Sequence, residues 1–158
     1  MEMPKPTEQH KKLYRFAGDW VGDEKLNPSP WGPGGTRTGR LTGRVDIEGF
    51  FVIQDYIQEN EGRACYHGHG IFSWDETQKC YAWYWFDSMG FVPPAPSRGK
   101  WEGDTLMFEH EPGGADGERR GRYTYRWSGD DAYYFKIENS TDGGQTWMTF
   151  MEADYRRA

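Results

Sequence analysis

Ten short runs rich in Val, Ile, Tyr, Phe, Trp and Thr follow one another along this chain, each bounded by Gly, Asp, Asn or Pro. That composition and spacing are typical of antiparallel strands joined by short loops. Strands are predicted at residues 19–25, 36–47, 50–59, 63–74, 79–86, 99–102, 105–110, 119–128, 132–139 and 147–157. Because closure removes the open edges of such a sheet, we expect an all-β fold, a single antiparallel barrel of about ten strands.

One short helix is predicted before the strands, at residues 7–16, where Thr7 is a suitable N-cap and Gly18 a suitable stop. No repeat of fixed period and no linker interrupts the rest of the chain. A chain of 158 residues is long enough to bury one core. We therefore expect one domain over residues 1–158, with residues 1–6 as a flexible N-terminal segment.

Aromatic residues are expected to supply most of that core, because they make up 17% of a chain whose mean hydropathy is −0.97. The formal charge of −6 disfavours a nucleic-acid partner, since phosphate backbones repel acidic proteins. The basic run at Arg119, Arg120 and Arg122 has acidic neighbours and is interpreted as a solvated strand face. No apolar run approaches the roughly 20 residues that span a bilayer, so we expect no membrane partner.

Two features favour a cytoplasmic location. Residues 1–6 lack the apolar stretch of a secretory signal. Cys65 and Cys80 fall in the two arms of a predicted hairpin around residues 75–78, and antiparallel pairing places them beyond disulfide reach. Two free thiols are therefore predicted, which suits a reducing compartment.

The segment from Ser140 to Trp147 matches the Asp-box pattern Ser-x-Asp-x-Gly-x-Thr-Trp. In that pattern the Ser and Asp side chains close a hairpin loop by bonding to its backbone, while the Trp packs beneath it. Asp142 and Trp147 are therefore predicted to be structural residues of a hairpin, with no information about function.

Gly18-Asp19-Trp20 at the start of the first strand resembles the Gly-x-Trp opening of lipocalins and fatty-acid-binding proteins. That resemblance implies that Trp20 plugs one end of the barrel and that a late Arg, either Arg156 or Arg157, packs over it.

A second resemblance covers nearly the whole chain. Residues 3–6, 51–56, 84–90 and 150–157 resemble a bacterial family of uncharacterised proteins, domain-of-unknown-function family 1579. The resemblance implies a lipocalin-like barrel of bacterial origin and no established reaction. The opening of the first strand is also partly similar to nitrobindin, a heme-binding barrel. Glu24 and Leu26 stand where its further glycines are expected, and the C-terminal region has no His to ligate heme. We therefore expect no cofactor.

The predicted strand at residues 63–74 has two distinct faces. One carries Cys65, His67, His69 and Ile71, and the other carries Tyr66, Gly68, Gly70 and Phe72. The hairpin that follows is expected to place the two histidines near Phe86 and Tyr84, and the two glycines opposite Trp85 and Trp83. Which face points into the barrel is left open.

The preceding loop decides what faces the histidines. If it has three residues, Asp55 faces His67, as in a general-base pair. The alternative is that Asp55 lies on an exposed strand face. If it has two residues, Gln54 and Tyr56 face the histidines instead. A metal site would need a third ligand beside His67 and His69, and no residue is recognisably spaced for that role, so none is predicted.

The loop at residues 87–96 carries Met89, Phe91 and Val92 between a Gly and three prolines, which suits a lid over a barrel mouth. Packing against its own barrel or a second subunit is the alternative. Trp31, in the loop at residues 27–35, is expected at the same rim.

The favoured function is binding of a small, largely apolar or aromatic ligand in the barrel cavity. The predicted ligand-binding residues are Asp55, Tyr56, His67, His69, Tyr84, Phe86, Asp87 and Met89. One alternative is a cofactor-free enzyme that uses an Asp/His pair in the cavity, with no catalytic residue assigned. The other is a self-filled barrel that acts as an assembly module or homodimer.

Overall fold

The computed structural model describes residues 1–110 and 117–158, and within them the chain forms a closed antiparallel barrel of ten strands. A short helix α1 (Glu8–Lys11) and a 3-10 turn η1 (Tyr14–Phe16) come first, and η2 (Ile47–Gly49) joins β2 to β3. The strands are β1 (Gly18–Leu26), β2 (Gly35–Asp46), β3 (Phe51–Asn60), β4 (Arg63–Asp75), β5 (Cys80–Asp87), β6 (Ser97–Glu102), β7 (Thr105–Glu109), β8 (Arg120–Trp127), β9 (Ala132–Ser140) and β10 (Met148–Arg157).

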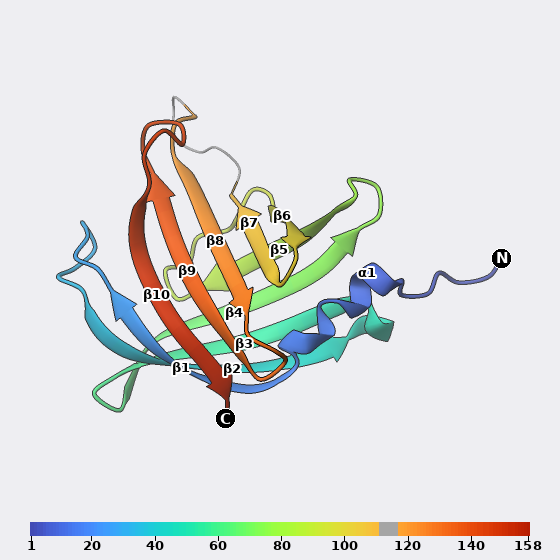
Figure 1. Ribbon diagram of the computed structural model, residues 1–158, viewed down its shortest axis with the longest axis horizontal. Coiled ribbons are helices and arrows are strands. Elements are labelled where there is room, and N and C mark those ends of the chain that lie inside the picture. Colours follow the sequence, from blue (N-terminus) through green and yellow to red (C-terminus); the bar gives the residue numbers. More distant parts are fainter. Residues whose placement is uncertain (111–116) are drawn as a thin grey trace.

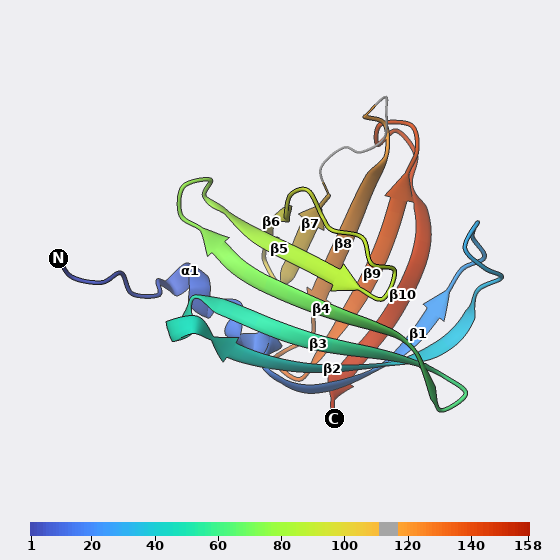
Figure 2. The same cartoon turned by 180° about the vertical axis from the view of Figure 1, so that it is seen from behind.

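Each strand pairs with its neighbours in the chain, and β1 closes the barrel by pairing with β10. Strands β8 to β10 cross steeply over β2 to β4, which form the opposite wall (Figure 1). The view from behind shows β2 to β4 in front and the N-terminal segment extending away from the barrel (Figure 2). The predicted all-β fold and its ten strands are confirmed.

The predicted helix at residues 7–16 is shorter than expected. Regular helix ends at Lys11, and a 3-10 turn follows at Tyr14–Phe16. The tighter turn lowers Leu13 and Phe16 into one end of the barrel, where their side chains are 1% and 0% exposed. The regular helix therefore ends early because the 3-10 turn buries these two side chains.

Rings from several strands fill this closed end around Phe16. The Phe16 ring stacks on Phe72 at 4.8 Å and meets Tyr125 and Trp127 edge-on at 5.1 and 5.0 Å. Trp83 stacks on the other side of Phe72 at 5.7 Å. The tryptophan-bearing face of β4 and β5 is thus the inner one, which answers the question that the sequence left open.

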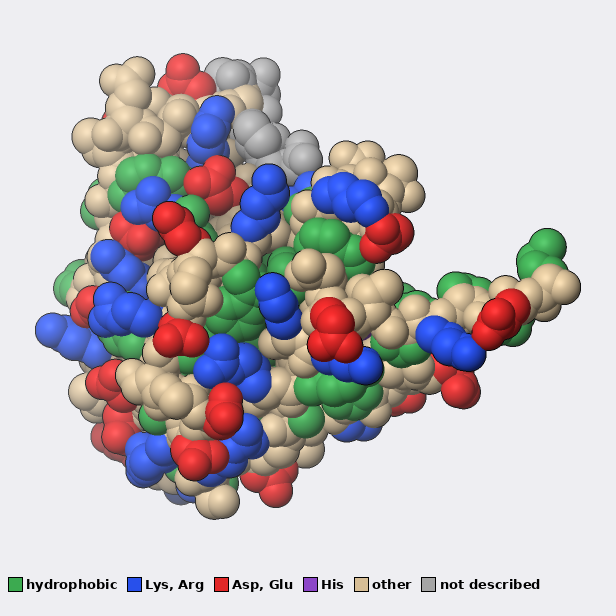
Figure 3. Space-filling view, turned by 45° about the vertical axis from the view of Figure 1, so that its right-hand side comes forward, with side chains coloured by type: hydrophobic (Ala, Val, Ile, Leu, Met, Phe, Trp, Pro, Cys, Tyr) green, Lys and Arg blue, Asp and Glu red, His purple; other side chains and the backbone are tan. Residues whose placement is uncertain are grey.

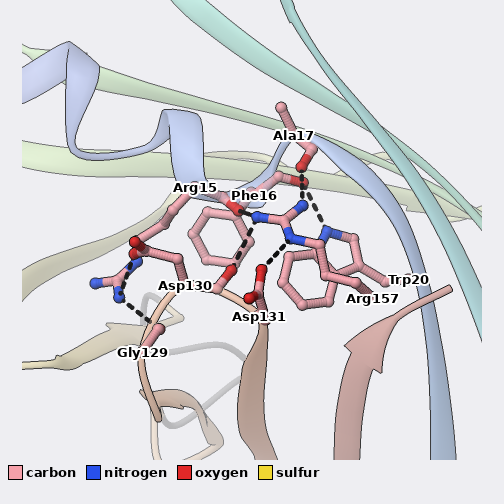
Figure 4. Close-up of polar contacts among 8 residues, drawn as sticks. All are labelled: Arg15, Phe16, Ala17, Trp20, Gly129, Asp130, Asp131 and Arg157. Atoms are coloured by element: carbon pink, nitrogen blue, oxygen red, sulfur yellow. Dashed lines mark hydrogen bonds and ion pairs between the residues drawn. The ribbon is translucent and has the colours of Figure 1, made fainter.

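Trp20 lies in the same plug, beneath a guanidinium group from β10. The Arg157 guanidinium carbon is 4.2 Å from the centre of the Trp20 ring (Figure 4). Arg157 also donates hydrogen bonds to the carbonyl oxygens of Ala17 and Arg15 at 2.6 and 3.2 Å. Of the two candidates, the packing residue is Arg157 and not Arg156, because Arg157 is the register partner of Trp20. Arg156 points outward and pairs with Asp23 at 3.2 Å.

Two hairpin registers differ from the predicted ones. An irregularity beside Cys65 shifts β4 against β3, so Asp55 pairs with His69, whereas His67 pairs with Ile57. Neither loop alternative gave this register, because a bulge adds one residue to β4 alone. In the next hairpin Gly70 lies opposite Trp85, where Trp83 was expected. The shift is two residues, so every side chain keeps its predicted face.

Both cysteines are free thiols, with Cys65 exposed and Cys80 buried. On the face shown in Figure 3, basic and acidic side chains are interspersed. Arg122 of the basic run donates two hydrogen bonds to the carboxylate of Glu138, at 3.1 and 3.0 Å. The side chain of Arg122 is 26% exposed and that of Glu138 11%, so this part of the run is paired and partly buried, whereas a solvated strand face was predicted.

Candidate functional site

The end of the barrel opposite α1 and η1 has inward-facing side chains that remain partly exposed. Tyr66 of β4, Trp85 of β5, Tyr123 of β8 and Ile137 of β9 all belong to the inner face, since all four pack against the buried core. Each is nevertheless only half-buried. An inner-face side chain can meet water only through the barrel mouth, and we call this end, where these side chains remain partly exposed, the open half.

Two glycines of β4 form part of the wall of this open half. The Trp85 ring lies directly over Gly68, where any side chain would overlap its six-membered ring. A Cβ at Gly70 would lie 3.0 Å from Nε1 of Trp83. The bare backbone at both positions therefore lets the indole rings lie flat against the wall.

Glu24 is the centre of a polar cluster inside the barrel. Its carboxylate is 2% exposed and accepts a hydrogen bond from the Tyr56 hydroxyl at 2.7 Å and another from the Gln58 amide at 2.9 Å. The Tyr155 hydroxyl donates to the same carboxylate. Burial, together with the charge of Glu24, raises the pKa of Tyr56, so its hydroxyl remains a neutral donor.

Asp87 forms a second polar cluster where β5 ends at the mouth. Its carboxylate accepts hydrogen bonds from the Tyr66 hydroxyl and, at 3.1 Å, from Nε1 of Trp85. The other carboxylate oxygen accepts from the backbone N–H of Met89 at 2.9 Å. Burial and the bond to Asp87 raise the pKa of Tyr66. Asp87 thus orients two rings of the open half and the first turn of the loop.

The two clusters border one space, because their rings are in contact. The centre of the Tyr56 ring lies 6.0 Å from that of Tyr66 and 5.7 Å from that of Trp85. Trp85 in turn lies 5.7 Å from Trp83, and Trp83 meets Tyr123 edge-on at 4.9 Å. An aromatic surface therefore joins both carboxylate clusters to the opposite wall.

Several buried donors around this surface have no hydrogen-bond partner within the described residues. They include Nε2 of Gln54 and Nε1 of Trp83, whose side chains are 2% and 5% exposed. Gln54 is the register partner of Gly70, over which Nε1 of Trp83 lies. Both unpartnered donors therefore belong to side chains that adjoin Gly70.

The predicted ligand-binding residues separate into two groups. Tyr56 and Asp87 lie inside, as described above. The other strand residues, which are Asp55, His67, His69, Tyr84 and Phe86, lie on the outer face because they alternate with inner residues of β3, β4 and β5. They do not share a cavity with Tyr56 and Asp87, so the notion of one common site is wrong.

The Asp/His pair is real but lies outside the barrel. Nδ1 of His69 is 2.8 Å from the carboxylate of Asp55, and Arg44 contacts the other carboxylate oxygen at 3.2 Å. The hydrogen bond from His69, with the neighbouring positive charges, lowers the pKa of Asp55. A cofactor-free enzyme with this pair in the cavity is therefore inconsistent with the structure.

The loop at residues 88–96 is fixed at its start, exposed around residues 88–92 and buried again at Pro96. The backbone N–H of Ser88 donates to the carbonyl oxygen of His67 at 2.9 Å. Met89, Phe91 and Val92 are 58%, 75% and 82% exposed, as is much of Trp31 at 72%. In this conformation these side chains lie outside the aromatic surface of the interior, and their role as a lid stays a prediction.

Sequence reasoning missed Glu24, Tyr66, Trp85 and Tyr123 as site residues. A signal for Glu24 was present, since it stands four residues after Trp20 on the same strand and so on the same face. Tyr66 and Trp85 could not be assigned to the interior before the inner face of β4 and β5 was known, nor Tyr123 before that of β8.

Among residues 1–110 and 117–158, no three or more His, Cys, Asp or Glu side chains are grouped to hold a metal ion. The same residues contain no helix long and apolar enough to cross a membrane.

A closed ten-stranded antiparallel barrel, with one end plugged by rings and a polar aromatic interior at the other, defines a protein of the lipocalin-like class. The chain belongs to the family described as "Protein of unknown function (DUF1579)", whose model matches residues 5–157.

Two solved structures resemble the whole barrel. The crystal structure of Rv2717c from M. tuberculosis has a TM-score of 0.70 at 13% identity, covering 96% of this chain and 98% of that one. The S-type phycobiliprotein lyase CPES from Guillardia theta has a TM-score of 0.64 at 9% identity, covering 94% and 92%. At these identities the likeness shows the fold alone. No curated protein sequence matches the chain.

Proposed function

We propose that this protein binds a small aromatic ligand in the open half of its barrel. The observation that carries the proposal is the partial exposure of Tyr66, Trp85 and Tyr123, which face inward in a barrel whose other half is fully packed. A flat ligand lying on these rings would remove their faces from water and gain stacking contacts.

The polar groups of the interior support the same function. Asp87 holds Tyr66 and Trp85 in place through hydrogen bonds, so these rings need little ordering when a ligand arrives. A few fixed polar groups among apolar rings are typical of small-molecule sites. The fold likeness to a phycobiliprotein lyase agrees with a barrel of this kind but identifies no ligand.

The test is calorimetric titration of the full chain with naphthylmethanol, a neutral aromatic probe. Saturable binding is expected, and Trp85→Ala is expected to weaken it by about tenfold, since a lost ring contact costs about 1.4 kcal/mol. Tyr84→Ala is the matched control, because Tyr84 is the adjacent aromatic residue on the outer face and is 39% exposed. Native mass spectrometry of the protein as purified adds a search for a copurified small molecule.

Absence of saturable binding, or equal losses in Trp85→Ala and Tyr84→Ala, would contradict a site in the open half. An unchanged affinity in Trp85→Ala would do so as well.

A further inference from the structure

The carboxylates of the open half restrict which ligands it can accept. Glu24 and Asp87 are the acidic side chains among the described residues that face the aromatic surface formed by Tyr56, Tyr66 and Trp85. Asp87 also influences the opposite wall, where its charge adds to burial in raising the pKa of Tyr123. A ligand on this surface therefore lies between two negatively charged groups.

Neither carboxylate is neutralised by a basic side chain. Every hydrogen bond to Glu24 comes from an uncharged phenol or amide, and those to Asp87 come from a phenol, an indole and a backbone N–H. The ion pairs among residues 1–110 and 117–158 all involve other carboxylates. Uncharged donors stabilise a carboxylate but leave its net charge in place.

Several basic side chains also belong to the inner face, and two of them have other contacts. Arg37 is the register partner of Glu24, but its guanidinium donates to the carbonyl oxygen of Thr36 at 2.8 Å and makes no ion pair within residues 1–110 and 117–158. Nδ1 of His110 lies 3.2 Å from the hydroxyl of Ser97. The charged groups that bond directly to the rings of the aromatic surface are the two carboxylates.

A ligand carboxylate on the aromatic surface would lie close to the carboxylates of Glu24 and Asp87, and like charges repel one another strongly where water is partly excluded.

We infer that the site selects aromatic molecules without negative charge and excludes aromatic and fatty carboxylates. The inference rests on the proposed function, because it concerns the same site. A barrel that binds an anionic ligand needs positively charged or neutral donor groups around it, whereas the groups bonded to this aromatic surface are carboxylates.

Three probes with one ring test the inference by calorimetry at neutral pH. They are naphthylmethanol, naphthylmethylamine and naphthoate, which carry no charge, a positive charge and a negative charge. The alcohol and the amine are expected to bind, and the naphthoate to bind at least about tenfold more weakly. A probe is taken to bind inside the barrel only if Trp85→Ala weakens its binding.

Asp87→Asn should reduce the difference in affinity between naphthylmethanol and naphthoate. The substitution removes one negative charge and keeps an acceptor oxygen for the Tyr66 hydroxyl. Glu24→Gln is the second variant and should act in the same direction. Asp23→Asn is the matched control, since Asp23 adjoins Glu24 on β1 but its side chain is on the outer face and 80% exposed.

Naphthoate binding as tightly as the alcohol would overturn the inference and leave the proposed function standing. The inference would also be overturned if neither Asp87→Asn nor Glu24→Gln changed the difference in affinity between naphthylmethanol and naphthoate. Failure of all three probes to bind would remove the proposed function, and the inference with it.

Discussion

Arg157 connects three parts of the closed end that are far apart in the sequence. Its guanidinium lies over the Trp20 ring, donates to the carbonyl oxygens of Arg15 and Ala17 at η1, and donates to the carbonyl oxygen of Asp130 at 2.9 Å. A planar group with five donors can serve these partners together, whereas an ammonium group cannot. The residue thus fastens η1 to the closed end of the barrel.

Arg157→Lys is accordingly expected to lower the free energy of unfolding by about 1.5–3 kcal/mol, the range for hydrogen bonds to charged groups. Arg156→Lys is the control, because Arg156 makes one exposed ion pair, with Asp23, and such pairs contribute about 0–1 kcal/mol. Denaturant unfolding of the two variants beside the wild type gives the comparison. Equal losses would show that Arg157 has no special role in the plug.

At the scale of elements, the hairpin between β9 and β10 is held by the Asp-box side chains. The Asp142 carboxylate accepts hydrogen bonds from the backbone N–H of Thr146 at 2.9 Å and from the Ser140 hydroxyl at 2.8 Å. The Ser140 hydroxyl also accepts from the N–H of Gly144 at 2.9 Å, and the Trp147 indole N–H donates to the Gly144 carbonyl oxygen at 3.1 Å. The loop is therefore closed by its own side chains, in the manner that the motif predicted.

The stability that Asp142 contributes should depend on pH. The hydrogen bonds from Thr146, followed by that from Ser140, lower the pKa of Asp142 to about 2. Its contribution is therefore complete above the unfolded-state pKa of about 3.9 and is lost as the pH falls toward the folded-state value. We expect Asp142→Asn to melt a few degrees below the wild type at neutral pH, with a difference that shrinks below about pH 4.

Thermal unfolding monitored by circular dichroism across that range measures the difference. Asp154→Asn, on the exposed face of β10, serves as the control. A difference between wild type and Asp142→Asn that stays constant from neutral to acidic pH would show that the ionised carboxylate does not hold the loop.

The strands could be predicted from the sequence because each depends on local composition and on turn residues. The positions of the site residues depend instead on the register between neighbouring strands. The bulge beside Cys65 adds one residue to β4, and no local preference in the sequence marks it. It decides that Asp55 meets His69, where the sequence alternatives offered His67. Likewise, Trp85 faces inward because its ring fits over Gly68, a contact between strands that alternation alone could not orient.

At the level of the whole molecule, the two halves of the barrel differ in how deeply their rings are buried. The closed half contains rings that are almost fully buried around Phe16, which is 0% exposed. The open half contains the partly exposed rings of Tyr66, Trp85 and Tyr123.

This difference between the two halves predicts that removing a ring lowers the free energy of unfolding by different amounts in each half. Phe16→Ala should lower the free energy of unfolding by about 3–5 kcal/mol, because it leaves a cavity among packed rings. Trp85→Ala should cost about 1–2 kcal/mol, since water already reaches part of the indole and can enter the space that it leaves. Denaturant unfolding followed by far-ultraviolet circular dichroism measures both without relying on tryptophan emission. Equal costs would mean that the open half is as much a part of the folding core as the plug. A small cost for Trp85→Ala, together with its loss of naphthylmethanol affinity, would show that binding can be removed from this barrel while its fold is kept.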